Sequence, residues 1–221
     1  ELREIKIEDG FLSIGAMSSH SKVMSNKDVN EVFPILCKIL SQVAHPAIRN
    51  KGTHGGSVAY GDPAAELPAF AVLVDAQIVL SGSSGERIVS AKEFYKGLFE
   101  TSINPDEILT SVKYPINQNN KQLFFDEITR RHGDYAMAGL VGSIKQKSNI
   151  NEEINLVFFG TGDKPNEAPK TCEYLLKNEY NYSNIKDILK NEIEFASDIS
   201  SSSDMKAHLS AILVGRMMKE L

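Results

Sequence analysis

A glycine-rich segment in the first third of the chain constrains its fold more than any other stretch. Residues 49–66, RNKGTHGGSVAYGDPAAE, hold four glycines between two apolar runs. Glycine adopts positive φ angles and lets a backbone approach a ligand without a Cβ in the way. Consecutive amides in such a loop can also form an anion-binding nest. The segment therefore indicates a phosphate-binding loop or a tight surface turn, and a Gly-Gly pair alone favours the turn.

Side chains around these glycines suit a phosphorylated, polyhydroxylated cofactor. Thr53 and Ser57 supply hydroxyl donors, and Glu66 supplies an acceptor for a sugar or ribityl hydroxyl. Neither familiar glycine fingerprint fits the segment. A Walker loop places lysine after its glycines, whereas Lys51 lies before them, and the Rossmann spacing G-x-G-x-x-G is absent. Nucleotide binding here would use another architecture.

Composition excludes several classes of protein. The net charge of −5 and the lack of a Lys/Arg-rich run argue against a general nucleic-acid binder. No stretch approaches the roughly 18 apolar residues of a membrane span, and no signal peptide opens the chain, so we expect a cytoplasmic location. Cys37 and Cys172 cannot form a four-cysteine cluster, so any iron–sulfur centre would lie on another chain. The histidines lack metal-ligand spacing, and we expect no metal.

Hydrophobic periodicity predicts the elements of the first half. Alternation around Asp9-Gly10 predicts a hairpin over residues 2–7 and 11–16. Apolar residues at helical spacing predict helix over about 28–44, with Pro34 in a first turn or between two helices. Further strands are expected over residues 77–80, 86–89 and 107–114.

The polar residues 117–121 predict a domain boundary near residue 118, giving domains 1–118 and 119–221. Beyond it the pattern predicts a three-stranded antiparallel sheet over residues 123–130, 136–145 and 154–159. Helices should follow over 168–178 and 184–196, and a last helix after the capping cluster Ser201–Asp204. Strands followed by helices indicate the α+β class.

Three blocks of this chain together match one known pattern. In the first block the matching positions are Ile48 to Asn50, Gly52, Thr53, Gly55 to Ser57, Ala59, Gly61 to Pro63 and Ala65 to Pro68. The second block is 124–136, FFDEITRRHGDYA, and the third is the opening strand LSIGA over 12–16. These blocks resemble the FAD-binding medium subunit of molybdenum hydroxylases, of the carbon monoxide dehydrogenase and xanthine dehydrogenase type. The resemblance spans nearly the whole chain.

The resemblance implies a fold for each half. Residues 1–118 would form the second part of a PCMH-type FAD-binding α/β domain. Residues 119–221 would form a C-terminal domain like that of the carbon monoxide dehydrogenase flavoprotein, a three-stranded antiparallel sheet packed with helices. The family also has a preceding subdomain with a second glycine-rich loop that binds the pyrophosphate. Because this chain begins at the strand that follows that subdomain, we expect a truncated sequence.

The resemblance also implies a set of cofactor-binding residues and no catalytic ones. The stretch that would wrap the ribityl and pyrophosphate groups through amides and hydroxyls is Thr53, His54, Gly55, Gly56 and Ser57. Glu66 aligns with an acidic residue that binds FAD, and Val43 with a cofactor contact. Leu109 and Asp126 align with positions near the flavin. Val43 and Leu109 can equally be core residues.

His54 departs from the family, which has an apolar residue there. Its imidazole could hydrogen-bond the cofactor or tune the flavin potential, or it could be a tolerated substitution.

The implied function is electron transfer, in which the isoalloxazine carries the chemistry. A large molybdopterin subunit would hydroxylate the substrate, and a small 2Fe-2S subunit would pass electrons to FAD on this chain. The resemblance implies that the three subunits assemble as a dimer of heterotrimers. The flavin would reduce NAD, a quinone or oxygen. Two alternatives stay open: an assembly protein that keeps the fold without binding FAD, and a flavin oxidase of the vanillyl-alcohol type that acts alone.

Overall fold

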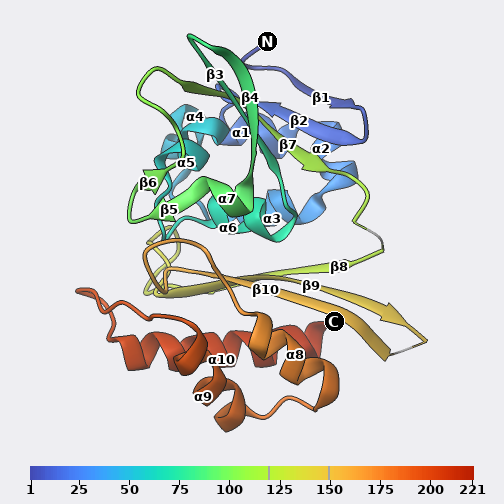
Figure 1. Ribbon diagram of the computed structural model, residues 1–221, viewed down its shortest axis with the longest axis vertical. Helices are drawn as coiled ribbons and strands as arrows, with labels where there is room; N and C mark the ends of the chain where they lie inside the picture. Colours follow the sequence, from blue (N-terminus) through green and yellow to red (C-terminus); the bar gives the residue numbers. More distant parts are fainter. Residues whose placement is uncertain (119, 149) are drawn as a thin grey trace.

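Four layers of secondary structure make up the computed structural model, which describes residues 1–118, 120–148 and 150–221 (Figure 1). The first layer is an antiparallel sheet in the order β1 (Ile5–Glu8), β2 (Phe11–Gly15), β7 (Ile108–Pro115), β3 (Gln77–Gly82) and β4 (Gly85–Ser90). The second layer holds α1 (His20–Ser25), α2 (Lys27–Val32), α3 (Pro34–Gln42), α4 (Pro46–Lys51), α5 (His54–Tyr60) and α6 (Glu66–Leu73). A short segment follows β4 in the chain and leads to one side of the molecule; it contains α7 (Ala91–Phe94), β5 (Tyr95–Gly97) and β6 (Glu100–Thr101).

The third and fourth layers come from the second half of the chain. A second antiparallel sheet has the order β11 (Asn166–Glu167), β10 (Ile150–Phe159), β9 (Ala138–Lys147) and β8 (Gln122–Ile128). Its outer face is covered by α8 (Pro169–Lys177), α9 (Tyr182–Glu192) and α10 (Ser203–Glu220) (Figure 1). The α+β class is confirmed. The sheet has four strands rather than the three expected, because the two-residue β11 pairs with β10 at Val157 and Phe158. Asn119, which opens the second predicted domain, lies outside the described residues.

Local sequence explains where the early elements begin and end. The hairpin of β1 and β2 turns at Asp9 and Gly10, both at positive φ, as the alternation predicts. Pro34 stands at the first position of α3, where its missing N–H leaves no intrahelical bond unmade. The predicted helix over 28–44 is therefore two helices. The predicted hairpin of β3 and β4 is also confirmed.

The second sheet is buried on both faces because consecutive apolar residues point to opposite sides. Phe125, Val141, Val157 and Phe159 pack with the first-layer sheet and the helices of the second layer. Their sequence neighbours, Phe124, Leu140, Leu156 and Phe158, pack with α8, α9 and α10 instead. A strand covered on both faces loses its polar alternation. The apolar pairs in these strands follow from this position.

One hydrogen bond between two fully buried side chains ties α5 to β7. The Nε2 atom of His54 lies 2.6 Å from the hydroxyl oxygen of Tyr114, and both side chains have no exposed surface. Burial lowers the pKa of His54 to about 3, so the ring is neutral at pH 7. A buried polar group costs stability when its partner is removed, whereas an exposed one finds water.

We expect Tyr114→Phe to lower the free energy of unfolding by about 1–3 kcal/mol, because it leaves a buried imidazole nitrogen without a partner. Tyr182→Phe is the matched control, since Tyr182 makes the same 2.6 Å bond to His208 at an exposed position. Its cost should stay near or below about 0.5 kcal/mol. Denaturant unfolding of both variants checks this, and equal costs would contradict it.

Candidate functional site

The glycine-rich segment is helical rather than an open loop. Its residues form the end of α4, all of α5 and the start of α6. The amides of His54 and Gly55 donate to the carbonyls of Ser18 and Ala16. The amide of Gly56 donates to the Thr53 hydroxyl, which caps α5, and that of Ser57 to the Thr53 carbonyl. These amides are bound within the fold, so the expected anion-binding nest does not form here.

Close packing explains the glycines. A Cβ on Gly55 would lie 2.4 Å from the Cβ of Ala16, and one on Gly56 would lie 2.6 Å from the Thr53 hydroxyl. Gly61 ends α5 at a φ of 63°, in the left-handed region that glycine adopts most readily. Glycine is therefore required for α5 to approach the strand β2 and for the chain to turn after it.

Three of the expected site residues meet in one pocket. A pocket of about 260 Å³ is lined by Val43, Ala44, Ile48, Ser57, Tyr60, Asp62, Ala65, Glu66, Gly133, Asp134 and Tyr135. Val43, Ser57 and Glu66 were expected from the sequence. The last three lining residues come from the second matching block, so two motifs far apart in sequence converge here.

The other expected residues lie outside this pocket. His54 is fully buried and bonds Tyr114, so its side chain packs in the core and does not face a cofactor there. Leu109 is a buried residue of β7 in the first core cluster. Asp126 forms an ion pair at 2.7 Å with Arg216 of α10. Thr53 acts as a helix cap.

Residues that the sequence reasoning missed supply the aromatic walls of the pocket. Tyr60 and Tyr135 are 61% and 72% exposed, which is high for large aromatic side chains. Gly133 has a φ of 84°, and a Cβ there would lie 3.0 Å from the His45 ring. The backbone can therefore pass close to Ala44 and bring Tyr135 to the pocket. The signal available in the sequence was the pair Asp134-Tyr135 near the end of the second block.

Two carboxyl groups interact here: Glu66, which is buried and lines the pocket, and Glu127, which is half-buried. Burial, with a smaller contribution from the nearby Asp62, raises the pKa of Glu66 to about 7. Burial also raises the pKa of Glu127 to about 8, with Glu66 as the next cause. In the described part of the chain, Oε2 of Glu127 is buried without a hydrogen-bond partner. A carboxyl that is partly protonated at neutral pH can donate or accept a hydrogen bond to a ligand.

Among the described residues, no group of three or more His, Cys, Asp or Glu side chains is arranged so that it could hold a metal ion. Among those residues there is also no helix long and apolar enough to cross a membrane.

Glu66→Gln should stabilise the protein increasingly as the pH rises. The raised folded pKa means that the stability contributed by the protonated carboxyl is complete below about pH 4.5 and declines as the pH rises through about 7. The gain should be near zero at pH 4.5 and reach up to about 3 kcal/mol at pH 8. Unfolding midpoints across this range test it, with Glu31→Gln on the exposed side of α2 as the control. A gain that does not change with pH would contradict the prediction.

Comparison with known protein families assigns both halves of the chain. Residues 1–117 match the FAD binding domain in molybdopterin dehydrogenase, and residues 124–221 match the CO dehydrogenase flavoprotein C-terminal domain. The glyceraldehyde dehydrogenase medium chain of Sulfolobus acidocaldarius is 32% identical over 100% of this chain and 79% of its own length. The carbon monoxide dehydrogenase medium chain of Hydrogenophaga pseudoflava is 31% identical over 71% of this chain and 54% of its own length.

Solved structures show the same fold. Quinoline 2-oxidoreductase from Pseudomonas putida 86 superposes with a TM-score of 0.90 at 31% identity, over 99% of this chain and 77% of that chain. Carbon monoxide dehydrogenase from Hydrogenophaga pseudoflava gives a TM-score of 0.89 at 27% identity, over 97% of this chain and 76% of that chain. The two family matches and the full-length relative agree with the motifs that converge at the pocket. The chain belongs to the family of FAD-binding medium subunits of molybdopterin-dependent dehydrogenases.

Proposed function

We propose that this chain carries electrons, through FAD, from the iron–sulfur centres of a molybdenum hydroxylase to an external acceptor. The observation that carries the proposal is the convergence of the segment 43–66 with Gly133–Tyr135 around one pocket. The family match and the oxidoreductase relatives support it. When bound, the isoalloxazine supplies redox chemistry that amino-acid side chains do not offer.

The pocket fits an uncharged, hydroxyl-bearing part of FAD. Ser57 offers a hydroxyl, and Glu66 makes no hydrogen bond with another side chain of the described residues. Val43 and Ile48 supply apolar contacts, and Tyr60 supplies an aromatic wall. We infer that these residues hold the ribityl chain or part of the ring system and exclude water from it.

The pocket does not suit the pyrophosphate. Asp62, Glu66 and Asp134 line it, and carboxylates repel a phosphate group. The amides of His54 to Ser57 already donate hydrogen bonds within the fold and are not available to a phosphate. The proposal therefore assigns Val43, Ser57 and Glu66 to the cofactor, and it treats Thr53, Gly55 and Gly56 as residues that position them.

The proposed assembly contains a large molybdopterin subunit and a small 2Fe-2S subunit, as a dimer of heterotrimers. Its support is that relatives are named as medium chains or as subunits of larger dehydrogenases. The proposed location is the cytoplasm, and the proposed domain boundary lies near residue 118. The acceptor would be NAD, a quinone or oxygen.

Glu66→Ala should weaken FAD binding roughly ten- to a hundredfold, because it removes a partly ionised carboxyl group whose hydrogen bond is worth about 1.5–3 kcal/mol. Titration of FAD fluorescence with each protein measures this at pH 7. Glu31→Ala, an exposed acid on α2, should bind FAD as the unchanged chain does.

A second variant tests the pocket without removing the Glu66 carboxyl group. Ser57→Leu keeps the buried carboxyl and fills the pocket, so it should also weaken binding. The assembly-protein alternative gains if the unchanged chain binds no flavin. Equal FAD affinity in the Glu66 and Glu31 variants would remove the pocket from the proposal.

A further inference from the structure

A second groove, larger than the cofactor pocket, opens beside it. Its volume is about 540 Å³, and it shares Tyr60, Asp62 and Tyr135 with the pocket. The remaining walls come from the turn between β5 and β6, the turn after β10 and the segment that precedes α10. A ligand in this groove would therefore lie against the same tyrosines as a cofactor in the pocket.

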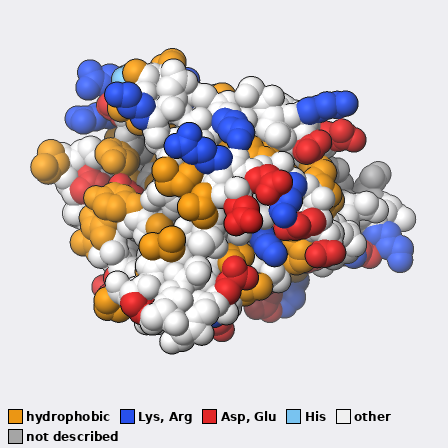
Figure 2. Space-filling model, turned by 90° about the horizontal axis from the view of Figure 1, so that it is seen from above, with side chains coloured by type: hydrophobic (Ala, Val, Ile, Leu, Met, Phe, Trp, Pro, Cys, Tyr) orange, Lys and Arg blue, Asp and Glu red, His pale blue; other side chains and the backbone are white. Residues whose placement is uncertain are grey.

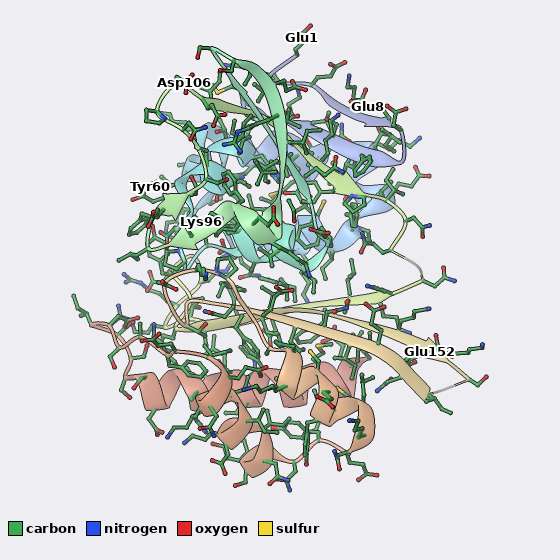
Figure 3. The ribbon with its side chains drawn as sticks, in the orientation of Figure 1. Glu1, Glu8, Tyr60, Lys96, Asp106 and Glu152 are labelled. Carbon is green, nitrogen blue, oxygen red and sulfur yellow. The ribbon has the colours of Figure 1, made fainter. Side chains whose placement is uncertain are left out.

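Exposed apolar side chains form one wall of this groove. Leu98 and Phe99 are 62% and 50% exposed at the tip of the β5–β6 turn. The rings of Phe99 and Tyr60 lie 4.9 Å apart between centroids. Hydrophobic side chains gather along the left edge of Figure 2, and Figure 3 shows Tyr60 on the corresponding side. Such a wall suits a flat, apolar ring.

The charges in the groove disfavour an anionic ligand. Asp62 and Asp198 both line it. Lys206, its buried cation, is only 5% exposed and is already engaged: its Nζ lies 2.7 Å from Oδ2 of Asp198 and donates to the carbonyl of Gly160. The nearby Arg130 and Arg131 line an adjoining groove. A pyrophosphate would thus find carboxylates and no available cation in this groove.

The wall that precedes α10 is held in place before any ligand arrives. Oδ1 of Asp198 accepts hydrogen bonds from the amides of Ser200 and Ser201. The amide of Ala196 donates to the carbonyl of Thr161. Together with the Lys206 ion pair, these bonds fix the segment, and a preformed wall lowers the ordering cost of binding.

We propose that this groove binds the ring of an uncharged aromatic electron acceptor of the quinone class. The proposal rests on the proposed function. Three features of the groove favour this acceptor class: the apolar wall of Leu98 and Phe99, the carboxylates of Asp62 and Asp198, and the two tyrosines shared with the cofactor pocket. As acceptor, the quinone would gain two electrons and two protons to become the hydroquinone, all supplied by the reduced flavin. The volume lies within the range typical of small-molecule sites.

A tryptophan reporter tests binding directly, because the chain contains no tryptophan. Phe99→Trp places the only indole in the wall of the groove, and a water-soluble benzoquinone such as ubiquinone-0 should quench it saturably. Ile150→Trp is the control, since Ile150 is 69% exposed in the β9–β10 hairpin. Figure 3 shows neighbouring Glu152 at the opposite end of the molecule from Tyr60. Quenching of the control tryptophan at position 150 should rise linearly with the quinone concentration.

A charge in the apolar wall tests the position of the site. Leu98→Asp, in the Phe99→Trp background, should raise the half-saturating quinone concentration at least fivefold. Ile108→Asp is the matched control, because Ile108 is 60% exposed at the start of β7, and its effect should stay within twofold. Circular dichroism of both variants confirms that the fold is kept.

Each outcome has one meaning. Linear quenching of both tryptophans, or equal effects of the two aspartates, overturns the proposal. So does NAD that displaces the quinone or binds the groove more tightly than the quinone does. Flavin titration of the same samples separates the two inferences: flavin binding without saturable quinone binding removes the groove, and quinone binding without flavin binding removes the proposed function alone.

Discussion

The close approach of α5 to β2 is the constraint on which the candidate site depends. The backbones of Gly55 and Ala16 can meet only because residue 55 has no Cβ. The hydrogen bond from His54 to Tyr114 then fixes α5 against β7 from the other side. With α5 held at both points, Ser57 and Tyr60 face the pocket, and Glu66 enters it where α6 begins.

The buried acids set the electrostatic character of this region. Glu66 and Glu127 carry raised pKa values because burial disfavours their charged forms and because each lies near another acid. The region therefore favours neutral ligand groups that can share a proton or donate a hydrogen bond. Burial of these carboxyl groups lowers the stability of the fold at high pH. Perturbed pKa values of this kind often occur where a protein binds a ligand.

Much of the fold followed from sequence patterns, but the form of the glycine segment did not. Hairpins, Pro34 and the apolar strands were identified because each has a local signal of turn, cap or alternation. The glycine-rich segment was predicted as a loop but is helical. The sequence pattern did not reveal this, because Gly55 is required by its contact with Ala16, a residue 39 positions earlier in the chain. The site followed in part: Val43, Ser57 and Glu66 meet, whereas Tyr60 and Tyr135 depend on how two distant segments fold together.

The two-sided burial of the second sheet has a consequence for how the chain holds together. Phe125 and Phe159 belong to the same hydrophobic cluster as Leu12 of the first sheet. The two segments that match separate families, residues 1–117 and 124–221, therefore share one apolar core. Separating the two halves would expose that shared cluster to water, so their folding is coupled. The two halves match different families, but because they share a hydrophobic core we expect them to unfold together.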